Sequence, residues 1–214
     1  TKVICKRRTN MANQDAPFGF KATGGMGSSY ETQGTSKYQI NDNWTNAIFQ
    51  GDLLGMGDGS ATDRAGTASV AGFVFGSIAA TTINLGVFNG CYYIDPTTAK
   101  PTWKAYYPGA VNITTGKIDA FVFDNPQQLY EVQTAGTLTQ ASCGKLADQN
   151  TYVAGSTLSG LSAMELSGTA ATSTAQWRII RLSEDPDNSD TGSANSNWIV
   201  RLNESIYYNL GTLT

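Results

Sequence analysis

The sequence contains no histidine, and only 14% of its 214 residues are charged. Without histidine the chain has no Ser–His or Cys–His catalytic pair and no histidine-ligated metal site. Its three cysteines, Cys5, Cys91 and Cys143, are widely spaced and include no Cys-x-x-Cys pair, so we expect free thiols and no structural zinc. The sequence therefore predicts neither a cofactor nor a metal centre built from these ligands.

Long apolar runs are also missing. No stretch approaches the roughly 18 apolar residues that indicate a transmembrane helix. The first ten residues contain too few apolar side chains for a secretory signal. We therefore expect a soluble protein that is made in the cytoplasm and has no membrane partner.

The charges are few and unevenly placed. The net charge is −3, but four of the fourteen cations, Lys2, Lys6, Arg7 and Arg8, lie in the first eight residues. The rest of the chain has 10 Lys and Arg (fourteen less four) against 17 Asp and Glu, which is a net charge of −7. A body surface of that charge argues against a nucleic-acid partner.

What the sequence does contain is typical of an all-β protein. It has 23 glycines, and the apolar runs 48–54 and 69–75 flank a loop rich in Gly, Asp, Ser and Thr that includes the turn pair Asp58-Gly59. Asn89-Gly90 predicts a hairpin inside the run 82–94. Further strand-like runs lie at 36–40, 103–107, 117–123, 129–133, 175–182 and 197–205. We predict a small barrel or sandwich-type β body with little helix.

Three regions are predicted along the chain. Residues 1–35 have little apolar surface, many glycines and Pro17, a composition that favours an extended N-terminal arm which folds only against a partner. The strand patterns that follow are interrupted by turn-forming residues at 124–128. This predicts one β subdomain over residues 36–126 and a second over residues 127–214.

An acidic loop is the only candidate for a metal site. Asp185 and Asp187 have the two-residue spacing of a calcium-binding loop, but the next acid, Asp190, and Gly192 come too late in the sequence. An exposed connection between two strands therefore explains these acids better than calcium does.

Two further kinds of chemistry remain open. Glu131, Glu165 and Glu204 lie in or beside strand patterns, where a pair of carboxylates could act as a glycosidase acid and its partner. The four Trp and ten Tyr could instead include a surface that stacks on sugars. Most of the other acids lie in turns and need no catalytic explanation, so we do not expect an enzyme.

Short motifs spread over residues 11–205 resemble, in their order along the chain, the head decoration or cement proteins of tailed bacteriophages. They are Met11-Ala12-Asn13, Gly19-Phe20, Gly51-Asp52-Leu53, Asp58-Gly59, Val70-Ala71-Gly72-Phe73, Gly76, Asp124-Asn125-Pro126, Leu129-Tyr130-Glu131-Val132-Gln133, Gly144-Lys145-Leu146-Ala147-Asp148, Ala175-Gln176-Trp177-Arg178-Ile179 and Asn197-Trp198-Ile199-Val200-Arg201-Leu202-Asn203-Glu204. Members of this family begin at the position of Met11, so residues 1–10 are either a basic extension or an artefact of the assigned start.

The resemblance implies a non-catalytic virion protein. Such proteins are made in the bacterial host and bind the outer surface of the major capsid protein lattice, often as homotrimers, where they resist the pressure of packaged DNA. The residues expected to contact the capsid are Lys6, Arg7, Arg8, Phe18 and Phe20. Two alternatives stay open: a carbohydrate-binding receptor or fibre module of the virion, and a tail-tube or head–tail connector protein.

Overall fold

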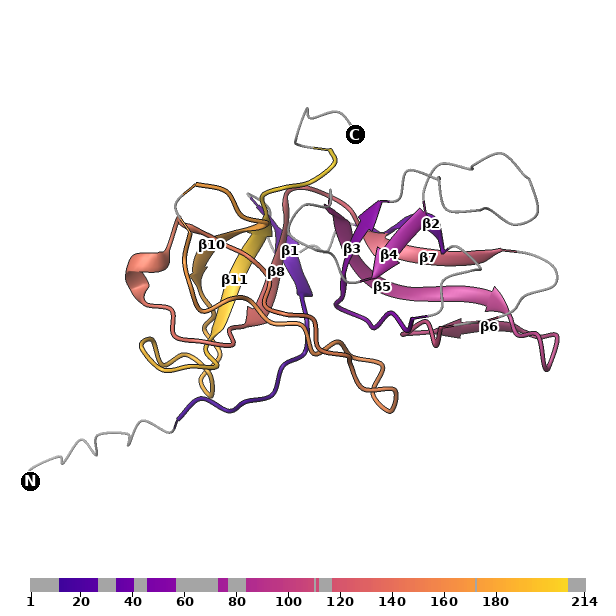
Figure 1. Cartoon of the computed structure of the whole chain (residues 1–214), viewed down its shortest axis with the longest axis horizontal. Helices are drawn as coiled ribbons and strands as arrows, with labels where there is room; N and C mark the ends of the chain where they lie inside the picture. The colour runs from indigo at the N-terminus through magenta and orange to yellow at the C-terminus, as the bar shows by residue number, and fades with distance from the viewer. Residues whose placement is uncertain are drawn as a thin grey trace, which may run out of the picture.

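The computed structural model describes residues 12–26, 34–40, 46–56, 73–76, 84–109, 111, 117–171 and 173–207. Over these residues the protein is all-β, as the sequence predicts. The strands form two sheets, and the helical structure in this part of the chain is the 3₁₀ turn η2 (Gln140–Ser142). Figure 1 shows the two sheets side by side along the long axis of the molecule.

The five-stranded sheet combines β1 with the strands of the C-terminal half. Trp177 and Ile179 of its strand β10 are buried while Arg178 between them is partly exposed, which is the two-residue alternation of a half-buried strand. All neighbouring strands are antiparallel. Their spatial order is β1 (Lys21–Gly25), β8 (Gln128–Gln133), β11 (Asn197–Leu202), β10 (Trp177–Leu182) and β9 (Leu146–Ala147).

The six-stranded sheet curls back on itself into a half-barrel. Its spatial order is β3 (Leu53–Met56), β4 (Phe73–Gly76), β2 (Ser36–Ile40), β7 (Ile118–Phe123), β5 (Asn84–Ile94) and β6 (Pro101–Lys104). The curl arises because β3 pairs with β5 as well as with β4. Strand β6 lies outside the closed set of pairings, because among the described residues it pairs with β5 alone.

The two sheets share one part of their core. Trp177 and Trp198 of the five-stranded sheet lie in a single buried cluster with Leu53 of β3 and Val87 of β5. A second cluster, which includes Leu85, Phe88 and Ile118, fills the inside of the curled sheet. Leu53 and Val87 therefore join the sheets through buried apolar contact as well as through the chain.

The predicted hairpin at Asn89-Gly90 is wrong. Strand β5 runs unbroken through this pair, and its register against β7 shifts between Phe88 and Gly90, which marks a β-bulge. The missing side chain of Gly90 makes room for a neighbouring indole, because a Cβ placed there would lie 2.6 Å from Cζ2 of Trp103. Pairing of β5 with β3, β6 and β7 outweighs the local turn preference.

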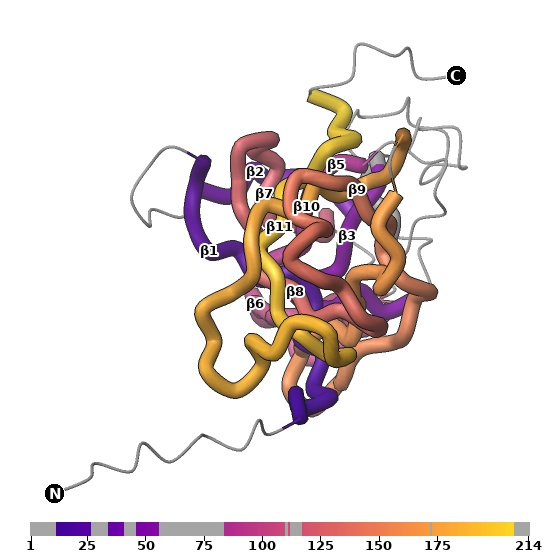
Figure 2. Tube along the Cα trace, turned by 90° about the vertical axis from the view of Figure 1, so that its left-hand side faces the viewer, coloured from indigo at the N-terminus to yellow at the C-terminus, as the bar shows by residue number. Residues whose placement is uncertain are grey.

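The prediction of an arm that folds only against a partner is wrong for residues 12–26. Strand β1 pairs with β8, and the segment before it is held by side-chain hydrogen bonds. Asn13 Nδ2 donates to the carbonyl of Ala194 (2.8 Å). The side chain of Gln133 accepts from the N–H of Ala16 (3.0 Å) and donates to the carbonyl of Gln14 (2.8 Å). Figure 2 shows this indigo segment passing beside the yellow loop that precedes β11.

The chain passes from one sheet to the other between β7 and β8. Strands β2 to β7 all belong to the six-stranded sheet and β8 to β11 to the five-stranded sheet, with residues 124–127 between them. Strand β1 is the exception, since it precedes β2 in the chain but lies in the five-stranded sheet. Residues 1–11 and 27–33 of the predicted arm lie outside the described residues.

Candidate functional site

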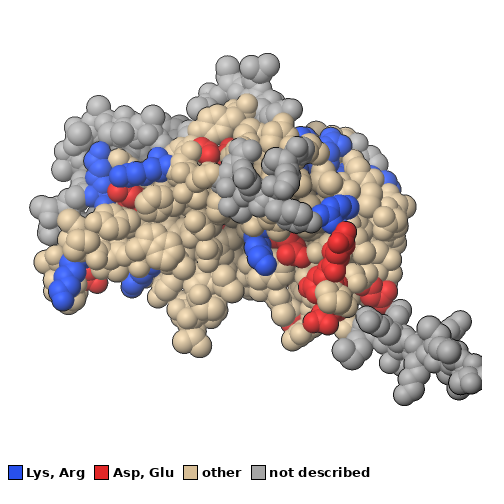
Figure 3. All heavy atoms as spheres, turned by 180° about the vertical axis from the view of Figure 1, so that it is seen from behind, with Lys and Arg blue, Asp and Glu red and all other residues tan. Residues whose placement is uncertain are grey.

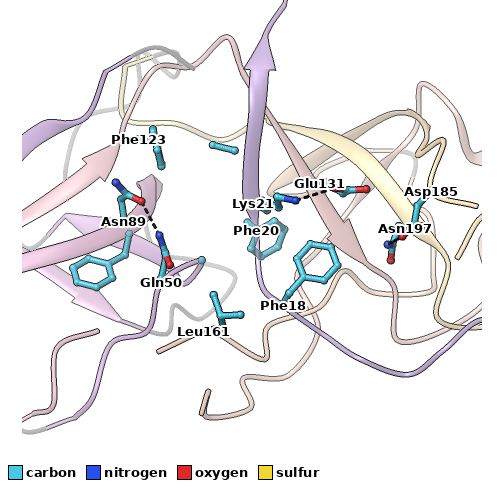
Figure 4. Close-up of a pocket in the computed structure, with 13 residues that line it drawn as sticks. Phe18, Phe20, Lys21, Gln50, Asn89, Phe123, Glu131, Leu161, Asp185 and Asn197 are labelled. Atoms are coloured by element: carbon cyan, nitrogen blue, oxygen red, sulfur yellow. Dashed lines mark hydrogen bonds and ion pairs between the residues drawn. The ribbon is translucent and has the colours of Figure 1, made fainter. Parts of the chain in front are cut away.

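A groove of about 490 Å³ lies where the two sheets meet (Figure 4). Strand β1 and the residues before it form one wall, and the six-stranded sheet forms the other. Its volume falls in the range of about 300–1,000 Å³ that is usual for ligand sites. The first wall includes Phe18, Lys21, Ala22, Glu131, Asp185 and Asn197. The opposite wall includes Gln50, Asn89, Phe123 and Leu161.

One end of the groove is rich in hydrogen-bond acceptors. Glu131 accepts a hydrogen bond from the Ser183 hydroxyl through one carboxylate oxygen, and its other oxygen lies 4.0 Å from Nζ of Lys21. Asp185 accepts from Nδ2 of Asn197 at 2.9 Å. Asn197 is only 3% exposed, and its side-chain oxygen has no hydrogen-bond partner. A buried acceptor without a partner is costly and usually signals a missing donor.

The opposite wall is apolar with one fixed amide pair. Gln50 Nε2 donates to Oδ1 of Asn89 at 2.9 Å, which orients both side chains at the bulge of β5. Leu161 remains partly exposed beside them, and Phe123 lies at the end of β7. In Figure 4 the ring of Phe18 lies between this apolar side and the acceptor-rich end.

A second depression of about 640 Å³ continues from the groove across the outer face of the five-stranded sheet. The two hollows share Lys21, Glu131 and Asp185. Figure 3 shows acidic side chains gathered at this end of the molecule, where the loop 183–190 carries Glu184, Asp185, Asp187 and Asp190. The second hollow is lined by the acids Glu131, Glu184 and Asp185 and by the cations Lys21 and Arg181, with Arg181 3.7 Å from Glu184. Three acids against two cations give it a slight excess of negative charge.

A separate apolar surface lies on the hairpin of β5 and β6. We call it the β5–β6 face, and it consists of Tyr92, Ile94, Pro101 and Trp103. Tyr92 pairs with Trp103 and Ile94 with Pro101 across the two strands, so all four side chains point to the same side. Trp103 is 55% exposed although its indole lies against Gly90.

The loop between β9 and β10 projects from the body (Figure 1). Its stem is closed by backbone hydrogen bonds from Ser156 N–H to the Leu161 carbonyl (3.0 Å) and from Gly160 N–H to the Ser156 carbonyl (2.7 Å). Leu158 at the tip is 98% exposed. Single exposed apolar side chains are common, so this residue does not by itself mark a site.

The residues expected to contact a capsid have different positions. The prediction that Phe20 contacts the capsid is wrong, because Phe20 is 1% exposed and its ring stacks on Trp177 with centroids 4.0 Å apart. Phe18 is only half-buried and lines the groove. The basic candidates Lys6, Arg7 and Arg8 lie outside the described residues.

The acids of the proposed calcium loop do not converge. Asp185 accepts the backbone N–H of Asp187 at 3.0 Å, and Asp190 accepts the hydroxyl of Ser193 at 3.0 Å. These are short-range bonds that stabilise turns. Across the described ranges, no group of three or more Cys, Asp or Glu side chains is placed to hold a metal ion.

The three candidate glycosidase acids are also dispersed. Glu131 pairs with Lys21. Burial raises the pKa of Glu165, and the negative charge of Asp15 raises it further. Burial also raises the pKa of Glu204, where the neighbouring charge is that of Asp148. Sequence patterns missed the groove because its acceptors come from separate strands and loops. They did predict a strand at residues 103–107, which overlaps β6 at Trp103 and Lys104.

None of the described helical structure is long and apolar enough to cross a membrane. No protein-family model, curated protein or solved structure matches the chain.

Proposed function

We propose that this chain is a structural protein of a tailed-phage virion, which binds the outer surface of the major capsid protein lattice and stabilises it without catalysing a reaction. The observation that carries the proposal is the β5–β6 face. Aromatic and apolar side chains are exposed there side by side on paired strands, where a soluble monomer gains nothing from exposing them.

The β5–β6 face has the composition of an interface centre. Trp and Tyr are enriched among the residues that carry most binding energy in protein complexes, and Trp103 and Tyr92 stand opposite each other on adjacent strands. The indole of Trp103 is held against Gly90, so it loses little conformational freedom when a partner covers it. This surface therefore suits tight contact with another protein.

The capsid is proposed as the partner because of the resemblance of residues 11–205 to cement proteins. A homotrimer on the capsid exterior would present three copies of the face at once. Linking the copies raises avidity by about 10²–10⁴ without any new contact. The low share of charged residues fits such contacts, because few ions need to be desolvated.

Trp103→Ala tests the proposal. We expect it to weaken binding to expanded heads at least tenfold, since loss of a central interface tryptophan costs roughly 2 kcal/mol or more. Binding is measured by co-sedimentation of purified protein with heads assembled from the major capsid protein. Leu158→Ala is the control, because it removes an exposed apolar side chain that does not belong to the β5–β6 face.

Equal retention of Trp103→Ala and the wild-type protein would show that the β5–β6 face is not the capsid contact. A second candidate function shares this face, because Trp103 and Tyr92 could also stack on sugar rings. Binding of the wild-type protein to a glycan array, together with no binding to heads, would favour that carbohydrate-binding role instead.

A further inference from the structure

The groove between the sheets presents the free edge of a strand. Among the described residues β1 pairs with β8 on one side only. The N–H of Phe20, just before β1, points away from β8 and donates to the carbonyl of Gly51 at 3.0 Å. Backbone groups two residues apart in a strand point to the same side, so those of Ala22 face the groove that this residue lines. A chain laid along this edge can pair with the N–H and carbonyl of Ala22, as far as the bulge that lies between Ala22 and Gly24.

The acceptor-rich end of the groove specifies the charge of such a chain. Asp185 and Glu131 supply two carboxylates, and Asn197 adds a buried side-chain oxygen that has no partner. The cation among the lining residues is Lys21, whose side chain is 68% exposed and 4.0 Å from Glu131. The groove therefore has more acceptors than donors and a net negative charge.

The remaining lining residues indicate that the cation of the bound chain has apolar neighbours. Phe18 and Leu161 leave partly exposed apolar surface beside the acceptors, and Phe123 closes the wall. An arginine fits this combination better than a lysine does. Its planar guanidinium has five donors in a fixed fork, which can bond a carboxylate and an amide oxygen together, and it packs favourably on an aromatic ring.

We infer that the groove binds an extended segment of the capsid protein in which an arginine is flanked by apolar residues. The segment lies along β1, its arginine reaches Asp185, Glu131 and Asn197, and its apolar side chains cover Phe18 and Leu161. The chemistry of the segment follows from the groove alone. Its assignment to the capsid protein rests on the proposed function.

Titration of the isotopically labelled full chain with three short peptides tests the chemistry. The peptides are capped at both ends, contain valines around a central residue, and differ in having Arg, Gln or Glu at the centre. We expect the Arg peptide to shift the amide signals of Lys21, Ala22 and the Asn197 side chain, with at least tenfold weaker binding of the Gln peptide. Equal shifts with all three peptides, or none, would overturn the inference, as would shifts only with a neutral glucan such as maltoheptaose.

Two variants separate binding from folding. Glu131→Gln combined with Asp185→Asn keeps the side-chain shapes and the acceptors for Ser183 and Asn197, although Asp185→Asn gives up the turn bond from the Asp187 N–H. The double variant should weaken binding of the Arg peptide about tenfold. Lys21→Gln removes the competing cation and should tighten binding about two- to fivefold, the range of a surface ion pair. A gain in affinity cannot result from misfolding. If Lys21→Gln weakens binding, the charge argument is wrong.

The head co-sedimentation assay distinguishes failure of this inference from failure of the proposed function. Normal retention of the Glu131→Gln, Asp185→Asn double variant, while Trp103→Ala is lost, would overturn the capsid protein as the groove's occupant and leave the proposed function standing. Preference for the Arg peptide in a wild-type protein that binds no heads would contradict the proposed function and support the chemistry of the groove.

Discussion

Asp52 is a fully buried carboxylic acid at the start of β3. One oxygen accepts the N–H of Phe49 at 2.8 Å, while the other has no hydrogen-bond partner. Burial raises the pKa of Asp52 to about 6, although the N–H of Phe49 and the nearby hydroxyl of Ser162 act in the opposite direction. The charged form is therefore poorly solvated, and the folded protein holds the proton more tightly than the unfolded chain does.

Asp52→Asn should remove part of the pH dependence of stability. A raised pKa means that the wild-type residue stabilises the fold fully below about pH 4, and that this contribution is lost as the pH rises through about 6. Asparagine keeps an acceptor for the Phe49 N–H and carries no charge. Relative to the wild type, the variant's free energy of unfolding should therefore increase by roughly 3 kcal/mol between pH 3 and 7.

Urea unfolding at a series of pH values measures this difference. Asp187→Asn is the matched control, because it makes the same chemical change at an exposed carboxylate. Parallel profiles for Asp52→Asn and the wild type would mean that Asp52 is not protonated more readily in the folded protein.

At the scale of single elements, the segment that leads into β1 is part of the folded body. Phe20 stacks on Trp177, whose indole also meets the ring of Tyr130 edge-on with centroids 5.5 Å apart. Phe20→Ala should lower the free energy of unfolding by about 3–5 kcal/mol, the usual cost of truncating a buried phenylalanine. Chemical denaturation followed by tryptophan fluorescence gives the value.

Phe18→Ala is the companion variant, because Phe18 lies two residues earlier and is half-exposed in the groove. We expect it to cost clearly less stability than Phe20→Ala. If both variants are as stable as the wild type, the segment before β1 is not anchored in the core as described.

Local sequence patterns predicted strands well wherever one face of the strand is buried. The strand predicted at 175–182 is an example, and it is confirmed by β10, which buries Trp177 and Ile179 on one face. The burial of Phe20 could not be read in the same way, because Pro17 and the nearby glycines favour an extended arm and its stacking partner is more than 150 residues away. The hairpin prediction at Asn89-Gly90 failed for a related reason, since pairing with three other strands decides the path of β5.

The candidate site was even less accessible to sequence reasoning. Lys21, Glu131, Asp185 and Asn197 come from three strands and a loop, so no spacing along the chain connects them. The sequence singles out Asp185 only because of its acidic neighbours in the loop. The unpartnered oxygen of Asn197 depends on packing, and no residue pattern reports it.

At the scale of the whole molecule, the shared core predicts that the two sheets unfold together. Leu53 and Val87 of the curled sheet pack in the cluster of Trp177 and Trp198, so loss of either sheet exposes apolar surface of the other. We expect tryptophan fluorescence and the reactivity of Cys91 to change at the same urea concentration. Cys91 lies in the second cluster, and burial raises its pKa to about 12, so its thiol should react only after unfolding.

The measurement uses a Cys5→Ser, Cys143→Ser background, in which Cys91 is the remaining thiol. Labelling of Cys91 at a clearly lower urea concentration than the fluorescence change would show that the curled sheet opens by itself. In that case the contacts of Leu53 and Val87 would be too weak to couple the two sheets.

The strand order of the five-stranded sheet also has a consequence for synthesis of the chain. Lys21 pairs with Glu131, so β1 cannot form its pairing until about 110 further residues have been synthesised. At the usual 5–20 residues per second this takes about 5–20 s. The delay is longer for the whole sheet, because β11 is its last strand to be made and lies between β8 and β10. The nascent chain can pair and curl the strands from β2 to β7 early, whereas Phe20 and Trp177 must remain without their full surroundings until residue 202 has left the ribosome.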